Sequence, residues 1–314
     1  MITTAAALRC QGLIKRFAET TAVDRLDLTV PTGSILGLLG PNGSGKTSTI
    51  RTTLGIYVPD GGSVDVLGSR DPLSVRHRVG YLPEERGLYA KMKVVEQLAF
   101  LASIRGLDQK ESTRRAGAWL DRVGLSDNAQ SLTSELSKGM QQKVQFASAV
   151  IRDPDLVVLD EPFTGLDPVN TRLLKELILE QRKRGATVVL STHRMEQVEA
   201  LCESICLIHH DRPVLSGVLA EIKAGYGRNT IALEYRAGNG TLADVPGVRR
   251  VEDTGQEARL ELEPGADAQA VIRTLLDRVE VQAVRLEHPH IEEIYLEKVG
   301  DQTVAPHAAD EETE

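Results

Sequence analysis

The glycine-rich stretch GPNGSGKT at residues 40–47 constrains the fold more than any other segment. It follows the apolar run SILGLL at 34–39, which predicts a buried strand, and it precedes TSTIRTTLGI at 47–56, which predicts a helix. Glycine permits left-handed backbone conformations and leaves the inner wall of a turn free of side chains. A strand, a tight turn and a helix in this order indicate an α/β fold with the turn at the carboxyl end of a strand.

The same stretch has the GxxxxGK[ST] pattern of a phosphate-binding loop. Backbone N–H groups of such a loop curl around phosphate oxygens, and the helix N-terminus adds partial positive charge. Lys46 is placed to reach the β- and γ-phosphates, and the Thr47 hydroxyl is placed to ligate Mg²⁺. The competing interpretation is a glycine-rich turn with a solvated lysine. The predicted loop comprises Gly40, Pro41, Asn42, Gly43, Ser44, Gly45, Lys46, Thr47 and Ser48.

The first two thirds of the chain alternate short apolar runs with helix-periodic stretches, which is typical of an α/β domain around a largely parallel sheet. Further strands are predicted at 156–160, 187–192 and 204–210. The region at about 88–152 is mostly helical, and we expect it to form an inserted helical subdomain. The whole first domain is expected to span residues 1–225.

A change of pattern near residue 225 predicts a second, smaller domain at residues 226–299. A length of 314 residues is also about twice that of a typical domain. The predicted order is three strands, a helix, a strand and a closing helix, which resembles a ferredoxin-like α+β sandwich. Residues 300–314 have little to bury and are expected to form a disordered acidic tail.

Two consecutive carboxylates end the apolar run LVVLDE at residues 156–161. The carboxyl end of a buried parallel strand lies beside the phosphate loop of an α/β fold. Asp160 is therefore placed to hold Mg²⁺ through water, and Glu161 to polarise an attacking water as general base. The competing interpretation is a polar strand end before a turn at Pro162.

A second candidate anion site lies in the segment SELSKGMQQK. Ser137 is a natural N-cap, and Gly139 follows it in the first turn of the predicted helix. The free N–H groups of a helix start can bind an anion. By itself this pattern is weak evidence for an anion site, and a simple helix cap is the favoured interpretation.

Five ordered motifs, GPNGSGKT, LSKGMQQK, LVVLDEP, TGLDP and STH, make residues 5–222 resemble the nucleotide-binding subunits of ATP-binding cassette (ABC) transporters. The resemblance implies a P-loop NTPase cassette that binds and hydrolyses ATP with Mg²⁺ and that dimerises head to tail. It implies that Phe17 stacks on adenine. It also implies that Ser137 and Gly139, in the signature LSKGM, contact the γ-phosphate held by the other subunit.

The resemblance assigns two further residues. Asp167, in TGLDP, falls on a loop that communicates across the dimer. His193, in STH, matches a histidine that contacts the γ-phosphate and helps to position the water. Without the family, Phe17 also fits an aromatic residue that packs on a strand, and His193 fits a capping or buried histidine.

The chain departs from the family pattern at three positions. Glu84, in VGYLPEERGLY, stands where the family usually has glutamine, and an ionised carboxylate cannot donate a hydrogen bond. Lys138 replaces a signature glycine, and Met140 replaces a signature glutamine. The stretches LPEERGLYAKMKV and HPHIEEIYLEKV also resemble exporter-type cassette subunits of sodium and drug extrusion systems.

Composition limits the partners of the chain. A net charge of -8 argues against a broad nucleic-acid-binding face, so no nucleic acid is expected. No apolar run approaches the roughly 20 residues that a membrane-spanning helix needs. The resemblance therefore implies a separate multi-spanning permease, a second copy of the chain or a paralogous cassette, and a peripheral place on the cytoplasmic face of the membrane. The alternatives are a soluble non-transport ABC ATPase and a nucleotide-dependent sensor.

The three cysteines, Cys10, Cys202 and Cys206, form no CxxC pair. We expect them to be reduced, structural thiols rather than metal ligands or a disulfide. Cys202 and Cys206 are expected to lie four residues apart on one helix, MEQVEALCESI.

Overall fold

The computed structural model describes residues 5–85, 87–236 and 242–303, and these divide between two compact units. The first unit is Met1–Val218 and the second is Leu219–Glu314. The division therefore comes before helix α7 (Leu219–Gly225), whereas the sequence pattern placed it after residue 225.

A six-stranded sheet forms the centre of the first unit, in the order β5-β6-β7-β3-β8-β9. The first five strands in this order are parallel, and β9 is antiparallel to β8. The strands predicted at 34–39, 156–160, 187–192 and 204–210 are confirmed as members of this sheet. Its strands are β3 (Ile35–Leu39), β5 (Val79–Leu82), β6 (Leu156–Asp160), β7 (Thr187–Thr192), β8 (Ser204–His209) and β9 (Arg212–Val218).

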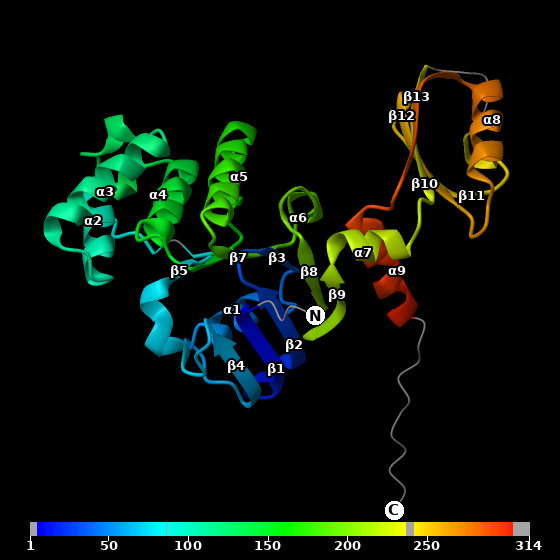
Figure 1. Cartoon of the computed structure of the whole chain (residues 1–314). Helices are drawn as coiled ribbons and strands as arrows, with labels where there is room; N and C mark the ends of the chain where they lie inside the picture. Colours follow the sequence, from blue (N-terminus) through cyan, green and yellow to red (C-terminus); the bar gives the residue numbers. More distant parts are fainter. Residues whose placement is uncertain (1–4, 86, 237–241, 304–314) are drawn as a thin grey trace, which may run out of the picture. The chain divides into compact units, whose positions relative to one another are not determined.

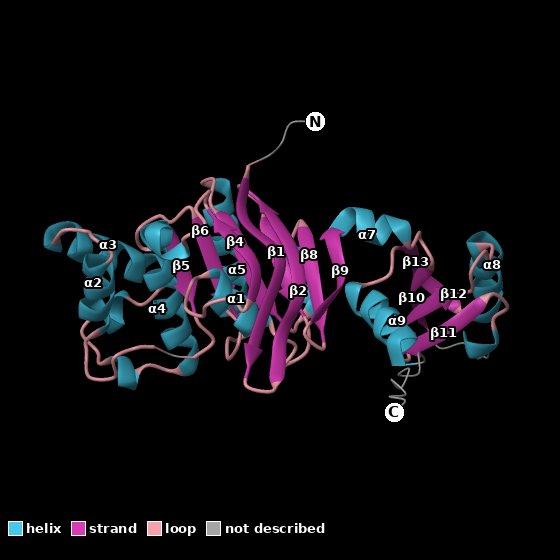
Figure 2. Cartoon of the chain, turned by 90° about the horizontal axis from the view of Figure 1, so that it is seen from below, coloured by secondary structure: helices cyan, strands magenta, loops and turns pink. Residues whose placement is uncertain are grey.

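A second, antiparallel sheet covers the first, in the order β2-β1-β4 (Figure 2). Its strands are β1 (Ala6–Phe17), β2 (Thr20–Pro31) and β4 (Gly61–Val66). Buried side chains of both sheets and Ile50 of helix α1 (Lys46–Thr53) share one apolar core. The sequence analysis did not predict this sheet, because its long strands carry many polar residues and several register shifts that break the alternation of apolar residues.

The inserted helical subdomain is confirmed as three helices beside β5 in Figure 1. They are α2 (Val94–Ile104), α3 (Gln109–Arg122) and α4 (Lys138–Val150), with the 3₁₀ turns η2 (Ser126–Asn128) and η3 (Thr133–Glu135). A third 3₁₀ segment, η1 (Pro72–Arg78), precedes β5. Helices α5 (Pro168–Lys183) and α6 (Met195–Leu201) complete the first unit.

Gly80 lets helix α4 approach strand β5 closely. A Cβ atom at Gly80 would lie 2.3 Å from the backbone oxygen of Ala149. Because this oxygen belongs to the backbone of α4, it cannot move aside as the end of a flexible side chain could. Gly80→Ala should therefore destabilise the protein by about 1–3 kcal/mol through overpacking. Thermal unfolding would measure the change as a lower Tm.

Gly117→Ala is the control for this prediction. Gly117 lies in the middle of α3, and a Cβ atom there would meet no other atom within 4 Å. This substitution should stabilise the helix by roughly 0.5–1 kcal/mol. Equal Tm values for the two variants would refute the close contact.

The second unit contains the four-stranded antiparallel sheet β11-β12-β10-β13. This is the strand order of a ferredoxin-like sandwich, but the described part of the β10–β11 connection holds only the 3₁₀ turn η4 (Leu242–Asp244) in place of a first helix. The predicted strands and both predicted helices are present. They are β10 (Thr230–Arg236), β11 (Val248–Asp253), β12 (Glu257–Leu262), α8 (Ala268–Arg278), β13 (Glu280–Glu287) and α9 (Ile291–Thr303).

Two expectations need correction. Helix α9 continues to Thr303, so residues 300–303 are helical rather than a disordered tail; the first proline after the helix is Pro306, and residues 304–314 lie outside the described part. Cys202 caps the end of α6, and Cys206 lies in β8, because the helix stops before the strand begins. The three cysteines are buried and free.

Among the described residues, no helix combines the length and apolar character needed to cross a membrane.

Candidate functional site

The loop of residues 40–47 is fixed by close approaches that only glycine allows. Gly45 has φ +99°, and a Cβ atom there would lie 2.1 Å from the backbone oxygen of Ala22. Gly40 has φ +152°, and its Cβ atom would lie 2.2 Å from the backbone oxygen of Ile208. A side chain at either position would displace backbone from a neighbouring strand or turn. The loop is therefore held between β2, β8 and the start of α1, with its N–H groups near one helix terminus.

Lys46 is buried at the start of α1 and bonds back to the loop itself. Its Nζ atom donates to the backbone oxygen of Gly40 at 2.8 Å and to that of Pro41 at 3.0 Å. Burial lowers the pKa of Lys46, and the nearby carboxylates of Glu161, Asp160 and Glu84 oppose this shift. The Lys46 ammonium therefore lies at the loop, where its hydrogen bonds to two neutral carbonyl oxygens can be replaced by stronger bonds to an anionic ligand.

A pocket of about 340 Å³ opens at this loop. It brings together segments that are far apart in the sequence, including all three carboxylates singled out by the sequence analysis. Its lining residues are Ala22, Asn42, Gly43, Gly45, Lys46, Thr47, Ser48, Glu84, Asp160 and Glu161. The pocket therefore combines loop N–H donors, one cation and three carboxylates.

Asp160, at the end of β6, is fully buried, and neither of its Oδ atoms has a hydrogen-bond partner among the described residues. Burial raises the pKa of Asp160, while the hydroxyls of Ser191 and Thr47 nearby favour the charged form. An unpaired buried carboxylate next to a threonine hydroxyl is a set of hard oxygen donors. These residues fit Mg²⁺, which binds one or two protein oxygens and takes its other ligands from phosphates and water.

Glu161 and His193 form a polar pair beside the pocket. One carboxylate oxygen of Glu161, Oε1, accepts from the backbone N–H of His193 at 3.0 Å and lies 2.8 Å from its Nδ1 atom. The other oxygen, Oε2, accepts from the Thr192 hydroxyl at 3.2 Å. Glu161 has φ +49°, an unusual backbone conformation for a residue with a side chain. The contacts and the turn aim the Glu161 carboxylate between the pocket and His193.

Eight residues that the sequence analysis selected do not line this pocket. Gly40, Pro41 and Ser44 belong to the same loop, and His193 contacts Glu161 beside the pocket. The other four are Phe17, Ser137, Gly139 and Asp167. Phe17 ends β1, is 41% exposed as a residue, and packs edge to face on Tyr57, with ring centroids 5.1 Å apart. Ser137 is confirmed as the N-cap of α4, since its hydroxyl accepts from the N–H of Met140.

Gly139 lies in the first turn of α4 near Gly165 and Leu166. Asp167 caps α5 by accepting from the N–H of Asn170. The sequence analysis missed Ala22, which lines the pocket from β2, because only the packing of β2 against the loop brings it there.

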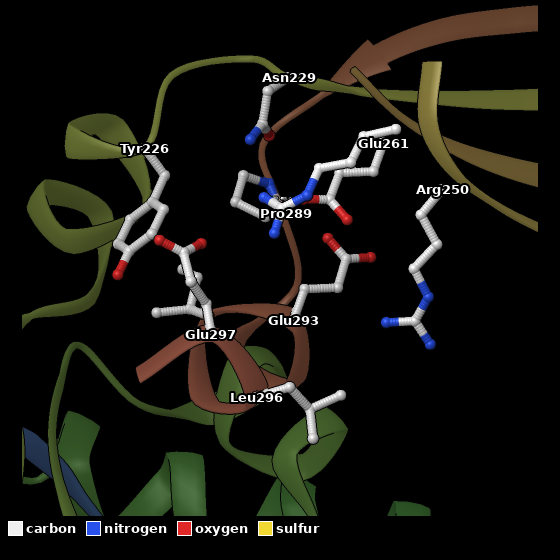
Figure 3. A pocket seen from close by; sticks show the side chains of 10 residues that line it. Tyr226, Asn229, Arg250, Glu261, Pro289, Glu293, Leu296 and Glu297 are labelled. Atoms are coloured by element: carbon white, nitrogen blue, oxygen red, sulfur yellow. Dashed lines mark hydrogen bonds and ion pairs between the residues drawn. The ribbon is translucent and has the colours of Figure 1, made fainter. Parts of the chain in front are cut away.

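The second unit has a pocket of its own, of about 320 Å³, which no sequence motif indicated (Figure 3). Arg249 pairs with Glu261 at 3.3 Å across neighbouring strands, and Arg259 pairs with Glu293 at 3.2 Å. Its charged groups of both signs largely neutralise one another, so the pocket has no clear preference for anions or cations. It is lined by Tyr226, Asn229, Arg249, Arg250, Glu261, Pro289, Glu293, Ile294, Leu296 and Glu297.

Comparisons with known proteins agree with the geometry of both units. The family model described as "ABC transporter" matches residues 23–164, and the model described as "ATP-binding protein DrrA1-3-like, C-terminal domain" matches residues 217–299. The chain is 40% identical over 293 residues to the uncharacterized ABC transporter ATP-binding protein YhaQ of Bacillus subtilis, covering 93% of this chain and 98% of that protein.

Two further similarities extend the comparison. The chain is 33% identical over 310 residues to the Nod factor export ATP-binding protein I of Ralstonia nicotianae, covering 93% of this chain and 94% of that protein. A solved ATP-binding subunit of an ABC transporter superposes with a TM-score of 0.66 at 32% identity, covering 70% of this chain and 93% of the other. With its phosphate loop, its buried carboxylates and these relatives, the chain belongs to the ATP-binding subunits of ABC transporters, which are ATPases, and it carries an additional DrrA-like C-terminal domain.

Proposed function

We propose that the pocket at the phosphate loop binds MgATP, with Thr47 and Asp160 as the protein ligands of the metal. Mg²⁺ would neutralise charge on the phosphates, which is its usual contribution to phosphoryl transfer. The loop N–H groups and Lys46 bind the β- and γ-phosphates. The support for this assignment is the fully buried Asp160 carboxylate, which has no hydrogen-bond partner among the described residues and lines the same pocket as Lys46 and Thr47.

Glu161 acts in this proposal as the general base that takes a proton from the attacking water. His193 orients the Glu161 carboxylate through its backbone N–H and Nδ1 contacts, and it reaches the γ-phosphate from the same side. Glu84 lines the same pocket and would contact the metal or the attacking water. The contact between Glu161 and His193 at a pocket that also contains Lys46 is the single observation that carries the ATPase site.

The remaining predicted residues belong in this proposal to a cassette dimer. Phe17, exposed at the end of β1, stacks on adenine. Ser137 and Gly139 lie outside the pocket of their own chain and would contact the γ-phosphate bound by a second copy or a paralogous cassette. Asp167 follows Leu166, whose side chain lies 3.5 Å from where a Cβ atom of Gly139 would be, and Asp167 would transmit the state of one site to the other. ATP would then favour the closed dimer because it contacts both subunits.

The dimer is proposed to drive a separate multi-spanning permease from the cytoplasmic face of the membrane, in the direction of export. The direction rests on the relative named as a Nod factor export protein, which aligns along almost the whole chain. The proposed permease contact is the surface around residues 84–94. There Tyr89, 54% exposed as a residue, packs edge to face on the ring of the exposed residue Phe100. Exposed aromatic pairs of this kind are common anchors of protein interfaces.

Capture of an ATP-bound complex tests this proposal. The Glu161→Gln chain, which should bind ATP without hydrolysing it, is expected to retain a multi-spanning membrane protein in mild detergent when ATP is present. The matched control is the double variant with Lys46→Ala, which should release the partner because it lacks the phosphate contact. Soluble partners only, or no partner, would favour the alternatives of a non-transport ABC ATPase or a nucleotide sensor. A multi-spanning partner that both variants retain equally would show that the association does not depend on ATP.

A further inference from the structure

Helix α4 carries two buried glutamines whose side chains end on the loops of the ATPase site. Gln142 donates from Nε2 to the backbone oxygen of Pro162 at 3.0 Å. Gln145 donates from Nε2 to the backbone oxygen of Glu85 at 3.2 Å. Pro162 directly follows Glu161, and Glu85 directly follows Glu84. Each glutamine therefore donates a hydrogen bond to the backbone of the residue that follows a carboxylate of the pocket.

The two contacts lie on one face of α4, because residues three or four apart share a face of a helix. Ala149, one turn beyond Gln145, has its backbone oxygen against Gly80 on the same side. Gly80 belongs to β5, the strand that leads directly to Glu84. One face of α4 thus contacts both the strand before Glu84 and the peptide after it, which fixes that loop at two points.

The side chain of Gln145 is poorly explained by stability alone. Its Oε1 atom is buried and has no hydrogen-bond partner among the described residues. A buried acceptor without a partner destabilises the folded state, so an apolar side chain of similar length would fit this place at least as well. What an apolar side chain cannot supply is the N–H donor that holds the Glu85 carbonyl.

We infer that Gln145 is a positioning residue of the ATPase reaction, which holds the Glu84 loop against α4 so that Glu84 faces the pocket. The inference rests on the role proposed above for Glu84 in the metal and water site. Gln142 acts in the same way on the turn after Glu161. The two amides set the separation of the carboxylates from one rigid helix, independently of the phosphate loop.

Gln145→Met tests the inference because it keeps the length of the side chain and removes only its polar end. At saturating MgATP we expect kcat to fall by about tenfold, since small displacements of a reacting group are costly. ATP affinity and Tm should stay at or above their wild-type values, because the phosphate loop is untouched and an unpaired acceptor is lost. A lower Tm with unchanged kcat would assign Gln145 a purely structural role. The control is Ser148→Ala, on the same helix. The Ser148 hydroxyl donates to the backbone oxygen of Gln145 within α4 and has no other hydrogen-bond partner among the described residues; kcat of this variant should not change.

A double-mutant cycle shows whether Gln145 acts through Glu84. If it does, the Glu84→Ala/Gln145→Met double variant should be no slower than Glu84→Ala alone. Multiplicative losses would overturn the inference. Wild-type turnover in Glu84→Ala would remove Glu84 from the reaction and the inference with it. A slow Glu84→Ala beside a fully active Gln145→Met would instead overturn the inference alone and leave the proposed role of Glu84 intact.

Discussion

Glu161→Gln is expected to lower ATP turnover by about a hundred- to ten-thousand-fold, which corresponds to about 3 to 5 kcal/mol in the activation barrier. The amide keeps the size of the carboxylate, and its oxygen can still accept from the backbone N–H of His193, as Oε1 does in the structure. The change removes the negative charge and the capacity to accept a proton from water, and an NH₂ group replaces the oxygen that accepts from the Thr192 hydroxyl. Steady-state phosphate release would measure the loss, and calorimetry should find unchanged ATP affinity.

Glu176→Gln is the matched control for this prediction. Glu176 lies on α5, its side chain is 62% exposed, and among the described residues its ion pair is with Arg172 one turn away. The same chemical change at that position should leave turnover unaltered, because exposed ion pairs contribute little. Near wild-type turnover in Glu161→Gln would exclude Glu161 as the general base, and weakened ATP binding would point to a role in the ground state.

Four strands of the six-stranded sheet and the elements of the second unit could be predicted from the sequence because their local signals are strong. The short strand β5 and the edge strand β9 were not predicted. Apolar runs such as residues 156–160 are fully buried on both faces of a parallel sheet, so every position is apolar until the carboxylate at the end. Ser137 was predictable as an N-cap for a similarly local reason, the preference of a side-chain oxygen for the free N–H groups of a helix start. The apolar strands and the helix cap both depend on residues that are close to one another in the sequence.

The antiparallel sheet of β1, β2 and β4 could not be predicted in the same way. Register shifts near Cys10 and Leu13 interrupt the alternation between buried and exposed residues that marks a strand. The lining of the pocket by Ala22 depends on this sheet, as does the narrow space that Gly45 fits. The contacts of Gln142 and Gln145 with loops far along the chain are equally long-range. The residues with the most distinctive chemistry were thus predictable, but not the backbone and amide groups that hold them in place.

The phosphate loop also depends on its lysine in a way that a second substitution can measure. Lys46→Ala should weaken ATP binding about 10- to 100-fold, because a hydrogen bond to a charged group contributes about 1.5–3 kcal/mol. Within the described part of the chain, the Lys46 ammonium donates to two neutral carbonyls of the loop. Exchanging these acceptors for anionic phosphate oxygens adds a charge–charge attraction to each hydrogen bond. Titration calorimetry with ATP and Mg²⁺ would measure the change in Kd.

Lys110→Ala serves as the control for Lys46→Ala, since Lys110 is exposed in the first turn of α3 and lines no part of the ATP pocket. Its Kd should match that of the wild type. Thermal unfolding separates a loss of affinity from a loss of structure, because removing the Lys46 contacts with Gly40 and Pro41 would lower Tm only if they stabilise the loop. Wild-type affinity in Lys46→Ala would place the phosphates elsewhere. Reduced affinity at an unchanged Tm would locate them at the start of α1, where the loop N–H groups, Thr47 and Asp160 meet.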